Sequence, residues 1–593
     1  MQNAETVLSV LRERGRRGLP CNELYRQMFN PQLYLLAYGR LYSNHGAMTA
    51  GATAETVDGM SLGKIGRIID ALRHERYRFS PARRVYIPKT NGKRRPLGLP
   101  SWSDKLVGEV VRLLLESYYE PQFSDRSHGF RPRRGCHTAL REVANTWTGT
   151  TWFIEGDIAD CFGSLDHQVM ITTLATNIHD NRFLRLIQNM LTAGYLEDWT
   201  YNATLSGTPQ GGVASPILSN IYLHRLDTFV ETVLIPEYTR GNRRAFNPAY
   251  RRVQYRVRQA RQRGDRDEAR ALGKQLRVLP SQDPNDPGYR RLRYMRYADD
   301  TVLGFIGPRS EAEQIKSRLA EFLANDLALE LSKEKTLITH ARTGAARFLG
   351  YEITVQHSTR KYRGRRTVNG TIGLRVPRTV IKTKCAPHLK RGEPACRNSL
   401  VNTDDHTIVA TFGAEYRGVV QYYLLAGDVH RLSRLRWVME SSMLKTLAGK
   451  HGSTAAKMAR LFKATIDTPH GPRTCFEATV ARSGGRKPLV ARFGGIPLRR
   501  QNTAILTDRP PAPPTRRKEL IDRLLTGRCE LCERTQDIEV HHIRKLSELT
   551  PARLANPPAW MRLMARRRRK TLVVCRTCHA TIHPGQPATP LTQ

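Results

Sequence analysis

The sequence predicts an α+β multidomain protein, and three observations carry that prediction. The chain has 593 residues, which is too many for one hydrophobic core, so we expect about three to five domains. Short runs of alternating apolar residues stand beside longer runs with helical spacing, and hydrophobic residues make up 40% of the chain, which suffices for packed cores. Two Cys-x-x-Cys pairs near the C-terminus predict a separate small module there.

Charge and composition narrow the class of protein. The formal net charge is +43, far more than solubility requires, which predicts a nucleic acid as a salt-sensitive partner. A basic enzyme of unrelated function is the alternative. No apolar run reaches the roughly 18 residues of a membrane span, and the N-terminus lacks the apolar core of a signal peptide. We therefore expect a soluble intracellular protein with no membrane partner, whose paired cysteines bind metal rather than form disulfides.

The first hundred residues predict a helical segment followed by a basic hairpin. Residues 1–80 carry apolar residues near helical spacing. Alternation over Arg84–Ile87 predicts a strand, Asn91-Gly92 predicts a turn, and a second strand follows. The cations spaced around this hairpin would clamp a triphosphate, and a solvated basic hairpin is the alternative.

Three carboxylates lie at the ends of predicted strands. Leu292–Tyr297 and Thr301–Ile306 alternate as the strands of a hairpin, with Asp299 and Asp300 at its tip. An adjacent pair of acids is most often a solvated turn, but the apolar strand Trp152–Asp157 also ends on a carboxylate. Three converging carboxylates can hold two divalent metal ions, which activate a 3′-hydroxyl and stabilise the leaving pyrophosphate in nucleotidyl transfer.

Three further stretches carry residues suited to a nucleotide or its polymer. Phe162 lies five residues past Asp157, where its ring would lie beneath an incoming sugar, and core packing is the alternative. The glycine-rich loop Gly207–Asn220 opens a helix, and the amide of Gln210 would bond a base or ribose edge. The loop Ser127–Gly135 is rich in Pro, Gly and Arg and suits backbone phosphates.

The middle of the chain predicts an insertion and then more of the sheet. Residues 239–293 hold sixteen Lys or Arg and five Asp or Glu, and 247–279 predicts one or two charged helices. We prefer an RNA-facing insertion to a solvated helical hairpin. Ser310–Leu327 then predicts an amphipathic helix, and Leu329–Thr336 and Arg347–Ile353 predict further strands.

The following region is basic and ends at a stiff linker. Residues 376–450 have helical spacing with Arg and Lys on the exposed side, which suits packing along a structured RNA. Residues 450–505 are basic and glycine-rich without clear periodicity, and Pro510–Pro514 predicts a linker.

The C-terminal module carries two candidate metal sites. Four cysteines have the ligand spacing of a tetrahedral structural zinc site: Cys529, Cys532, Cys575 and Cys578. Four histidines suit a second metal site, with His542 left free to deprotonate a water: His541, His542, His579 and His583. A purely structural zinc finger that binds DNA is the alternative.

With these residues assembled, the chain resembles, from about residue 60 to 590, the reverse transcriptase/maturase proteins encoded by mobile group II introns. It is similar to the subgroup with a C-terminal HNH endonuclease. The family's polymerase blocks match, in order, Arg83–Pro100, Ser127–Gly135, Phe153–Asp166, Gly207–Asn220, Arg296–Thr301, Leu331–Thr336 and Phe348–Tyr351. The resemblance implies a right-hand polymerase, with fingers and palm built on an antiparallel sheet and a helical thumb, plus a small zinc-containing ββα-metal HNH module.

The same resemblance implies five domains. These are an N-terminal helical extension (1–80), reverse transcriptase fingers and palm with the basic insertion at about 239–293 (81–375), a thumb or maturase domain (376–450), a DNA-binding region with the Pro-rich linker (451–515), and the HNH endonuclease domain (516–593).

Residue roles in the polymerase follow from the matched blocks. By resemblance Asp157, Asp299 and Asp300 are the catalytic carboxylates, and the carbonyl of Ile158 assists them in binding Mg²⁺. Five further residues would bind the dNTP and template. Arg83, Lys89 and Arg95 match the cations that hold the triphosphate, Phe162 matches the residue that excludes a ribose 2′-hydroxyl, and Gln210 matches a glutamine near the nascent base pair.

Roles in the nuclease follow in the same way. The four cysteines match the ligands of a structural Zn²⁺, and His541, His579 and His583 match the ligands of the catalytic divalent cation. His542 matches the general base. Many HNH enzymes have Asn five residues before the third Cys, where this chain has Lys570; Asn556 is another candidate, so the assignment of this Asn stays open.

The resemblance implies a multifunctional intron-encoded protein. It would bind its group II intron RNA and assist splicing, nick the second strand of a target DNA, and extend that 3′ end with dNTPs on the intron RNA template, which are steps of retrohoming. We expect it in the bacterial cytoplasm, on the nucleoid when it acts on target DNA, and a homodimer is left open. The alternatives are an RNA-binding splicing cofactor with a decayed polymerase site and a host-adapted reverse transcriptase without intron mobility.

Overall fold

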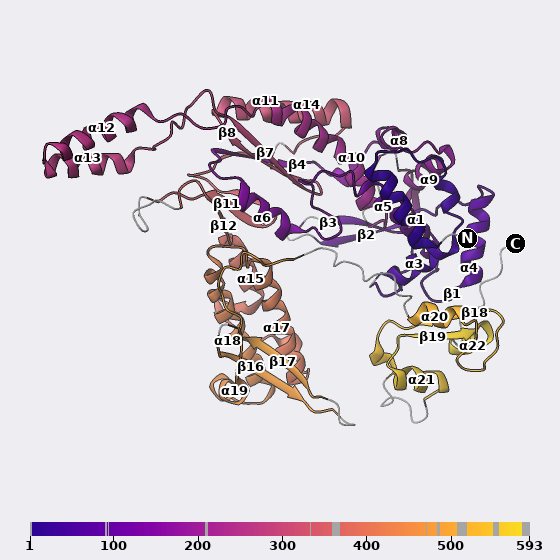
Figure 1. The fold of residues 1–593 in the computed structure, drawn as a ribbon. Coiled ribbons are helices and arrows are strands. Elements are labelled where there is room, and N and C mark those ends of the chain that lie inside the picture. The colour runs from indigo at the N-terminus through magenta and orange to yellow at the C-terminus, as the bar shows by residue number, and fades with distance from the viewer. Residues whose placement is uncertain are drawn as a thin grey trace.

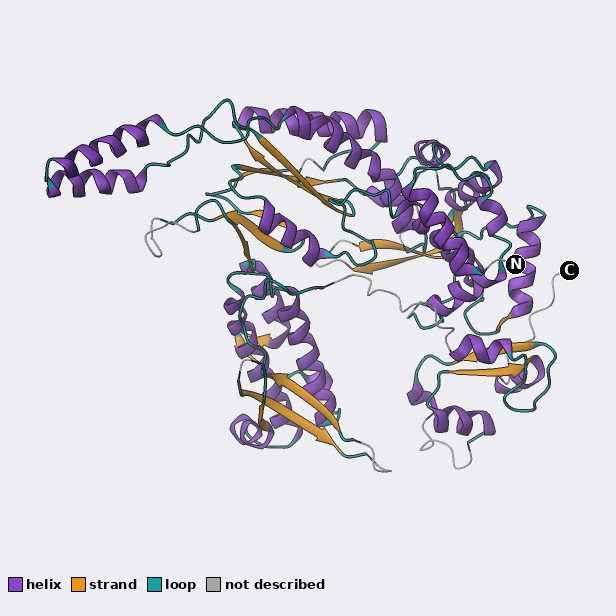
Figure 2. Cartoon of the chain, viewed as in Figure 1, coloured by secondary structure: helices purple, strands orange, loops and turns teal. Residues whose placement is uncertain are grey.

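Figure 1 shows the computed structural model, which describes residues 3–44, 46–88, 92, 94–204, 206–207, 211–332, 334–358, 368–469, 471–482, 487–506, 519–549 and 557–583. Helices and strands are mixed along the whole chain (Figure 2), as the α+β prediction required. Among the helices of these ranges, none combines the length and the apolar character needed to cross a membrane.

The N-terminal region is helical, as predicted. It holds α1 (Ala4–Arg16), α2 (Leu24–Gln27), α3 (Pro31–Leu41) and α4 (Leu62–Arg73), with the short strand β1 (Met60–Ser61) before α4. Asn30 caps α3 by accepting from the backbone N–H of Gln32, and Ser61 caps α4 by accepting from that of Lys64. The buried faces of these helices share one core with α5 (Trp102–Tyr119).

The predicted basic hairpin belongs to a four-stranded sheet. Its strands lie in the order β3-β2-β5-β6: β2 (Ala82–Pro88), β3 (Arg94–Leu99), β5 (Tyr195–Glu197) and β6 (Thr200–Asn202). Four helices follow or connect these strands: α6 (Cys136–Thr146), α7 (Cys161–Ser164), α8 (His167–Ala175) and α9 (Asn181–Leu191). The two described arms of the hairpin confirm the strand predictions on either side of Gly92.

A second four-stranded sheet carries the predicted acids. It is antiparallel in the order β7-β8-β4-β9: β4 (Trp152–Asp157), β7 (Arg291–Tyr297), β8 (Asp300–Ile306) and β9 (Ile338–His340). Alternation divides its side chains, so Ile154 and Leu303 lie in one core and Phe153 and Val302 in another. The first face packs against α14 (Arg309–Leu327) and against α10 (Ser215–Phe229), which continues directly into η1 (Val230–Leu234) and α11 (Ile235–Glu237).

The basic insertion is a helical hairpin that projects from the rest of the chain (Figure 1). It consists of α12 (Pro248–Gln262) and α13 (Arg266–Val278), so the stretch predicted as one or two helices forms two. The two helices pack on each other through a small apolar seam of Val257, Ala260 and Leu272. Most of its charged side chains are therefore exposed.

The second core is built mostly from residues 295–493, joined by α6, Trp147 and Phe153. It includes the sheet β10 (Ala346–Phe348), β11 (Tyr351–Val355) and β12 (Ile372–Arg375), the helices α15 (Arg378–Cys385), α16 (Asn398–Val401), α17 (Asp405–Tyr422), α18 (Ser433–Lys450) and α19 (Ala455–Phe462), and the short elements η2 (Ala386–His388), β13 (Leu389–Lys390), β14 (Glu393–Pro394) and η3 (Val429–Leu432). A three-stranded sheet also forms where the sequence showed no periodicity: β15 (Lys463–Ile466), β16 (Arg473–Val480) and β17 (Leu489–Gly494). It packs so closely on α17 that a Cβ at Gly413 would lie 2.2 Å from the carbonyl oxygen of Arg492.

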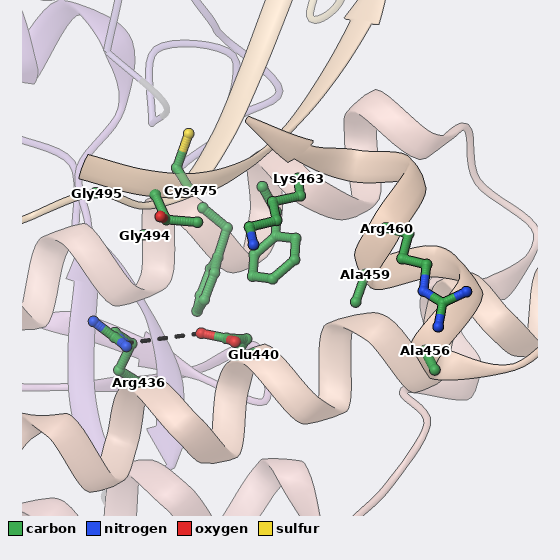
Figure 3. A pocket seen from close by; sticks show the side chains of 12 residues that line it. Arg436, Glu440, Ala456, Ala459, Arg460, Lys463, Cys475, Gly494 and Gly495 are labelled. Carbon is green, nitrogen blue, oxygen red and sulfur yellow. Dashed lines mark ion pairs between the residues drawn. The ribbon is translucent and has the colours of Figure 1, made fainter. Parts of the chain in front are cut away.

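A pocket of about 470 Å³ opens between α18, α19 and the sheet β15–β17 (Figure 3). Arg436 and Glu440 form an ion pair at 3.8 Å on one side of it, and Lys463 and Phe493 line another part. Its lining residues belong to neither of the sites described below.

The C-terminal module, residues 519–583 as described, lies against the N-terminal helices (Figure 1). It contains α20 (Glu519–Leu525), β18 (Ile538–His542), η4 (Leu546–Leu549), α21 (Ala559–Arg567), β19 (Thr571–Cys575) and α22 (Arg576–Ile582). Its two antiparallel strands are followed by a helix. Strand β1 of the N-terminal region adds to this sheet, since Met60 pairs with Val540 and Ser61 with Glu539.

Candidate active sites

The three predicted carboxylates, Asp157, Asp299 and Asp300, meet at one end of the antiparallel sheet; we call them the carboxylate cluster. Strands β4 and β8 are neighbours, and Asp157 is paired directly with Asp300. Asp300 is also paired with Tyr297 across the hairpin, so Ala298 and Asp299 form a two-residue turn. Strand register therefore brings together acids that are more than 140 residues apart in the chain.

The electrostatics of the carboxylate cluster favour a bound cation. Burial, together with the neighbouring charges of Asp299 and Asp157, raises the pKa of Asp300 to about 7. Burial also raises the pKa of Asp299, while the charges of Arg95 and Lys335 lower it. Carboxylate oxygens crowded in this way are suitable ligands for Mg²⁺, whose charge would offset their repulsion.

A lysine that sequence analysis gave no role completes this end of the sheet. The Nζ atom of Lys335 lies 2.7 Å from Oδ2 of Asp157. The prediction of a strand over Leu329–Thr336 is wrong, because the described residues of this stretch form a single bridge, between Leu331 and Ile158. The backbone N–H of Ser332 donates to the carbonyl of Asp157 at 2.8 Å, and the chain then turns, which brings Lys335 over the acids before β9 begins.

A buried ion pair positions the hairpin tip. Arg296 and Asp227 are fully buried, and their closest N–O distance is 2.6 Å. Arg296 also donates through Nη1 to the carbonyl of Ala298 at 2.9 Å, so the guanidinium reaches the turn that carries Asp299. Ala298 has a positive φ of 54°, a strained conformation for a residue other than glycine, and this hydrogen bond helps to hold it.

The loop Ser127–Gly135 packs against the same turn. The N–H of His128 donates to the carbonyl of Arg296 at 2.9 Å. A Cβ at Gly129 would lie 2.3 Å from the backbone nitrogen of Ala298, so only glycine leaves room there. Arg131, which the sequence suggested for phosphate binding, is buried and donates to Glu120 and to the carbonyl of Ser127. This loop supports the hairpin, and Arg131 is not available to a ligand.

Of the five predicted nucleotide-binding residues three are described, and Arg95 lies close enough to Asp299 for its charge to lower the pKa of that acid. Arg83 is half-buried on β2 and Arg95 is exposed on β3. Phe162 is half-buried and its ring lies 6.3 Å from that of Phe130, in an edge-to-face arrangement. Gly207 packs on the backbone of Phe162, with a positive φ of 87°. Lys89 and Gln210 lie outside the described residues, as does Asn556.

The four predicted zinc cysteines form a compact cluster in the C-terminal module. One sulfur of each lies within 4.8 Å of all the others: Cys529, Cys532, Cys575 and Cys578. Four thiolates at 2.3 Å from one Zn²⁺ would be about 3.8 Å apart, and the Sγ atoms of Cys532 and Cys575 are 3.5 Å apart. The residues fit a tetrahedral zinc site.

Three predicted histidines gather in a second cluster, joined by a residue that sequence analysis missed. The histidine cluster consists of Asp58, His541, His579 and His583, with one ligand atom of each within 4.8 Å of the others. Asp58 comes from the N-terminal region, just before β1. A lone Asp in Thr56–Met60 carries no signal in the sequence that could have identified it.

Proton sharing already links these four residues. Burial lowers the pKa of His579, but hydrogen bonds to Asp58 and Glu539 outweigh it and raise that pKa to about 9. Burial raises the pKa of Asp58, but hydrogen bonds from His541 and His579 hold it well below its usual range. Nitrogen and carboxylate donors of this kind suit a divalent transition metal.

His542 points away from the histidine cluster, as expected for the next residue on a strand. Its side chain is buried against α3, with Nε2 3.2 Å from the hydroxyl of Tyr38. Nδ1 lies 3.2 Å from the carbonyl of Val540, which can only accept, so Nδ1 carries the proton and Nε2 accepts from Tyr38. Burial lowers the pKa of His542 to about 4. The sequence predicted a free His542, and this arrangement shields it.

Comparisons with known families match three parts of the chain. Residues 87–353 match the reverse transcriptase (RNA-dependent DNA polymerase) family, 377–477 match the type II intron maturase family, and 529–579 match the AI2M/AI1M-like HNH endonuclease family. The carboxylate cluster lies in the first of these parts and both metal-ligand clusters draw on the third.

Relatives match along nearly the whole chain. The group II intron-encoded protein LtrA of Lactococcus lactis subsp. cremoris is 38% identical over 579 residues, which cover 94% of each chain. An uncharacterized 91 kDa protein in the cob intron of Schizosaccharomyces pombe is 32% identical and covers 95% of this chain and 70% of its own. A telomerase structure from Candida albicans has a TM-score of 0.30 and 12% identity, covering 64% and 62% of the two chains. The chain belongs to the group II intron-encoded proteins, as a reverse transcriptase/maturase with an HNH endonuclease domain.

Proposed function

We propose that DNA synthesis by this reverse transcriptase occurs at the carboxylate cluster. The observation that carries the proposal is the pairing of Asp157 with Asp300 beside the turn that holds Asp299. With the Ile158 carbonyl, Asp157 and Asp299 would hold two Mg²⁺ ions, which supply charge neutralisation and lower the pKa of the attacking hydroxyl.

The reaction is an in-line displacement. The 3′ oxygen of a DNA primer attacks the α-phosphorus of a dNTP. The bond between that phosphorus and the oxygen that bridges to the β-phosphate breaks, and pyrophosphate leaves. Arg83, Lys89 and Arg95 orient the triphosphate, and Lys335, beside Asp157, carries positive charge near the leaving group. Phe162 lies beneath the sugar and excludes a 2′-hydroxyl, and Gln210 contacts the nascent pair.

The domain arrangement proposed from the family is a right hand. Residues 81–375 form fingers and palm with the insertion at about 239–293, 376–450 form the thumb or maturase domain, and 451–515 bind DNA. The exposed cations of α12 and α13, together with the net charge of +43, support an RNA-facing role for the insertion.

The C-terminal module is proposed to cut the second strand of the target. Zn²⁺ at the four cysteines would hold its fold, and a divalent cation at His541, His579 and His583 would stabilise the charge that develops on the scissile phosphate. His542 would accept a proton from the attacking water once it is exposed. The cut supplies the 3′ end that the polymerase extends on the intron RNA, in the cytoplasm and at the nucleoid of a bacterium.

Primer extension on a poly-ribonucleotide template with Mg²⁺ tests the polymerase proposal. Asp299→Asn should lower the rate by at least about 1,000-fold, because a lost metal ligand removes several kcal/mol of transition-state stabilisation. Asp267→Asn is the matched control, since this acid on α13 is 96% exposed. Both variants should still bind intron RNA and assist splicing. Wild-type protein that binds RNA but extends no primer would overturn the proposal.

The comparisons support this function and not the alternatives of a splicing cofactor or a host-adapted enzyme. The discriminating observation is splicing in the Asp299→Asn variant. Equal loss of splicing and extension would show that the two functions do not separate.

A further inference from the structure

Asp58 belongs to the N-terminal region, yet its carboxylate lies inside the histidine cluster of the C-terminal module. Its Oδ2 is 2.9 Å from Nε2 of His583 and 3.3 Å from Nε2 of His579, and its Oδ1 is 3.4 Å from Nδ1 of His541. The side chain is only 18% exposed. It therefore approaches all three histidines at once, from a different part of the chain.

A second contact orients the ring of His579 toward this carboxylate. Nδ1 of His579 lies 2.9 Å from the carboxylate of Glu539, which accepts its proton, so Nε2 is the nitrogen that faces Asp58. His541 is 2% exposed, and its other nitrogen, Nε2, is buried without a hydrogen-bond partner among the described residues. Three ring nitrogens and one carboxylate oxygen lie within 4.8 Å of one another, as the ligands of one ion would.

The same segment also holds the module in place and covers His542. Oδ1 of Asp58 accepts from the backbone N–H of His542 at 2.7 Å. Directly after Asp58, the N–H of Gly59 donates to Val540, and β1 pairs with β18. On the other face of β18, the hydroxyl of Tyr38 donates to Nε2 of His542.

From this geometry we propose that Asp58 is the fourth protein ligand of the nuclease cation and that the bound ion fastens the C-terminal module to the N-terminal region in a resting state. The inference rests on the proposed nuclease site. Four protein ligands are typical of a closed structural site, whereas a catalytic site keeps a position open for water or substrate. Cleavage then requires a DNA phosphate oxygen to replace the Asp58 carboxylate, one anion for another, and His542 to leave Tyr38.

Co²⁺ binding to full-length protein tests the ligand assignment without using activity. The cysteine cluster is kept filled with Zn²⁺, and visible absorption reports four-coordinate Co²⁺ at the histidine cluster. Asp58→Asn should weaken this binding by about 10-fold or more, since even outer partners of metal ligands cost about 10- to 100-fold. Asn preserves the hydrogen bond from His542. Asp70→Asn, an exposed acid on α4, is the matched control and should bind like wild type.

Hydrogen exchange tests whether the ion fastens the module. In wild-type protein, Co²⁺ should slow amide exchange in β1 and β18 relative to β4 and β8, a measurement that needs no variant. The slowing should be absent in Asp58→Asn and in His541→Ala. At saturating Co²⁺, nicking of a DNA target by Asp58→Asn should be severalfold faster than by wild type, because the closing ligand is gone.

The outcomes separate two failures. If wild type shows no ion that depends on His541, the proposed nuclease site itself fails. If an ion depends on His541 but binds Asp58→Asn with wild-type affinity, or leaves exchange in β1 and β18 unchanged, the proposed role of Asp58 is overturned while the nuclease site stands. Slower nicking by Asp58→Asn with the ion bound would overturn the resting state.

Discussion

Gly129→Ala should disable the polymerase from a residue outside the proposed ligands. The added Cβ would lie 2.3 Å from the backbone nitrogen of Ala298, whereas ordinary contact begins at 3.4 Å. The hairpin tip must therefore move by about 1 Å, and Asp299 is the next residue. A misplacement of about 1 Å at reacting groups costs on the order of 100-fold in rate. The φ of Gly129 is not in the left-handed region, so space alone causes the effect.

The assay is the steady-state rate of primer extension at saturating dNTP, with splicing assistance measured on the same preparation. Gly273→Ala is the matched control, because nothing lies within 4 Å of its added Cβ on α13. The control should keep its rate, and Gly129→Ala should keep splicing. Overpacking also costs about 1–3 kcal/mol, so exchange in β5 and β6 checks that the rest of the fold persists. A Gly129→Ala enzyme with a normal rate would refute the proposed dependence on the hairpin position.

Three further predictions follow from other contacts. Asp227→Ala leaves Arg296 buried and unpaired, so the opening free energy of β7 and β8, read by hydrogen exchange, should fall by about 3–5 kcal/mol; unchanged protection would contradict the role of this pair. Cys575→Ser should remove one Zn²⁺ per chain and the exchange protection of β19 while primer extension continues, and retained zinc would exclude the four-cysteine site. Arg252 and Arg258 of α12 are exposed, and replacing both with Gln should make the affinity for intron RNA less dependent on salt. The slope of log affinity against log salt concentration should become shallower by about 0.7–0.9 for each phosphate that the variant no longer neutralises. An unaltered slope would place the RNA elsewhere.

Local patterns in the sequence were sufficient to predict most of the carboxylate cluster. The strands that carry Asp157 and Asp300 alternate strongly, and a hairpin with a two-residue turn has a fixed register, so the acids had to lie at the strand ends. The cysteine cluster could be predicted equally well, because a zinc site requires a characteristic spacing of its ligands in the sequence. In both cases the chemistry resides in residues close together in sequence or at the ends of regular elements.

Contacts across long separations could not be predicted. Asp58 lies more than 480 residues from His542, and nothing local distinguishes it from a solvated acid. The strand expected over Leu329–Thr336 failed because its backbone bonds to Asp157 and then turns. The sheet β15–β17 formed in a stretch without periodicity, since packing on α17 decides its burial. Arg131 looked available from the loop sequence, but tertiary contacts bury it.

The packing of the C-terminal module has a consequence for when it can cut DNA. Leu520, Ile521 and Leu524 of α20 and Val540 of β18 belong to the core of the N-terminal region, not to the module's own small core. Each such side chain contributes about 1.5–3 kcal/mol when fully buried, so separation of the module costs several kcal/mol even without an ion at Asp58. For the module to separate in a large fraction of molecules, DNA binding must therefore supply a comparable free energy. A chain of net charge +43 can supply it through phosphate contacts. A nuclease held in this way would cut where the rest of the protein is already bound.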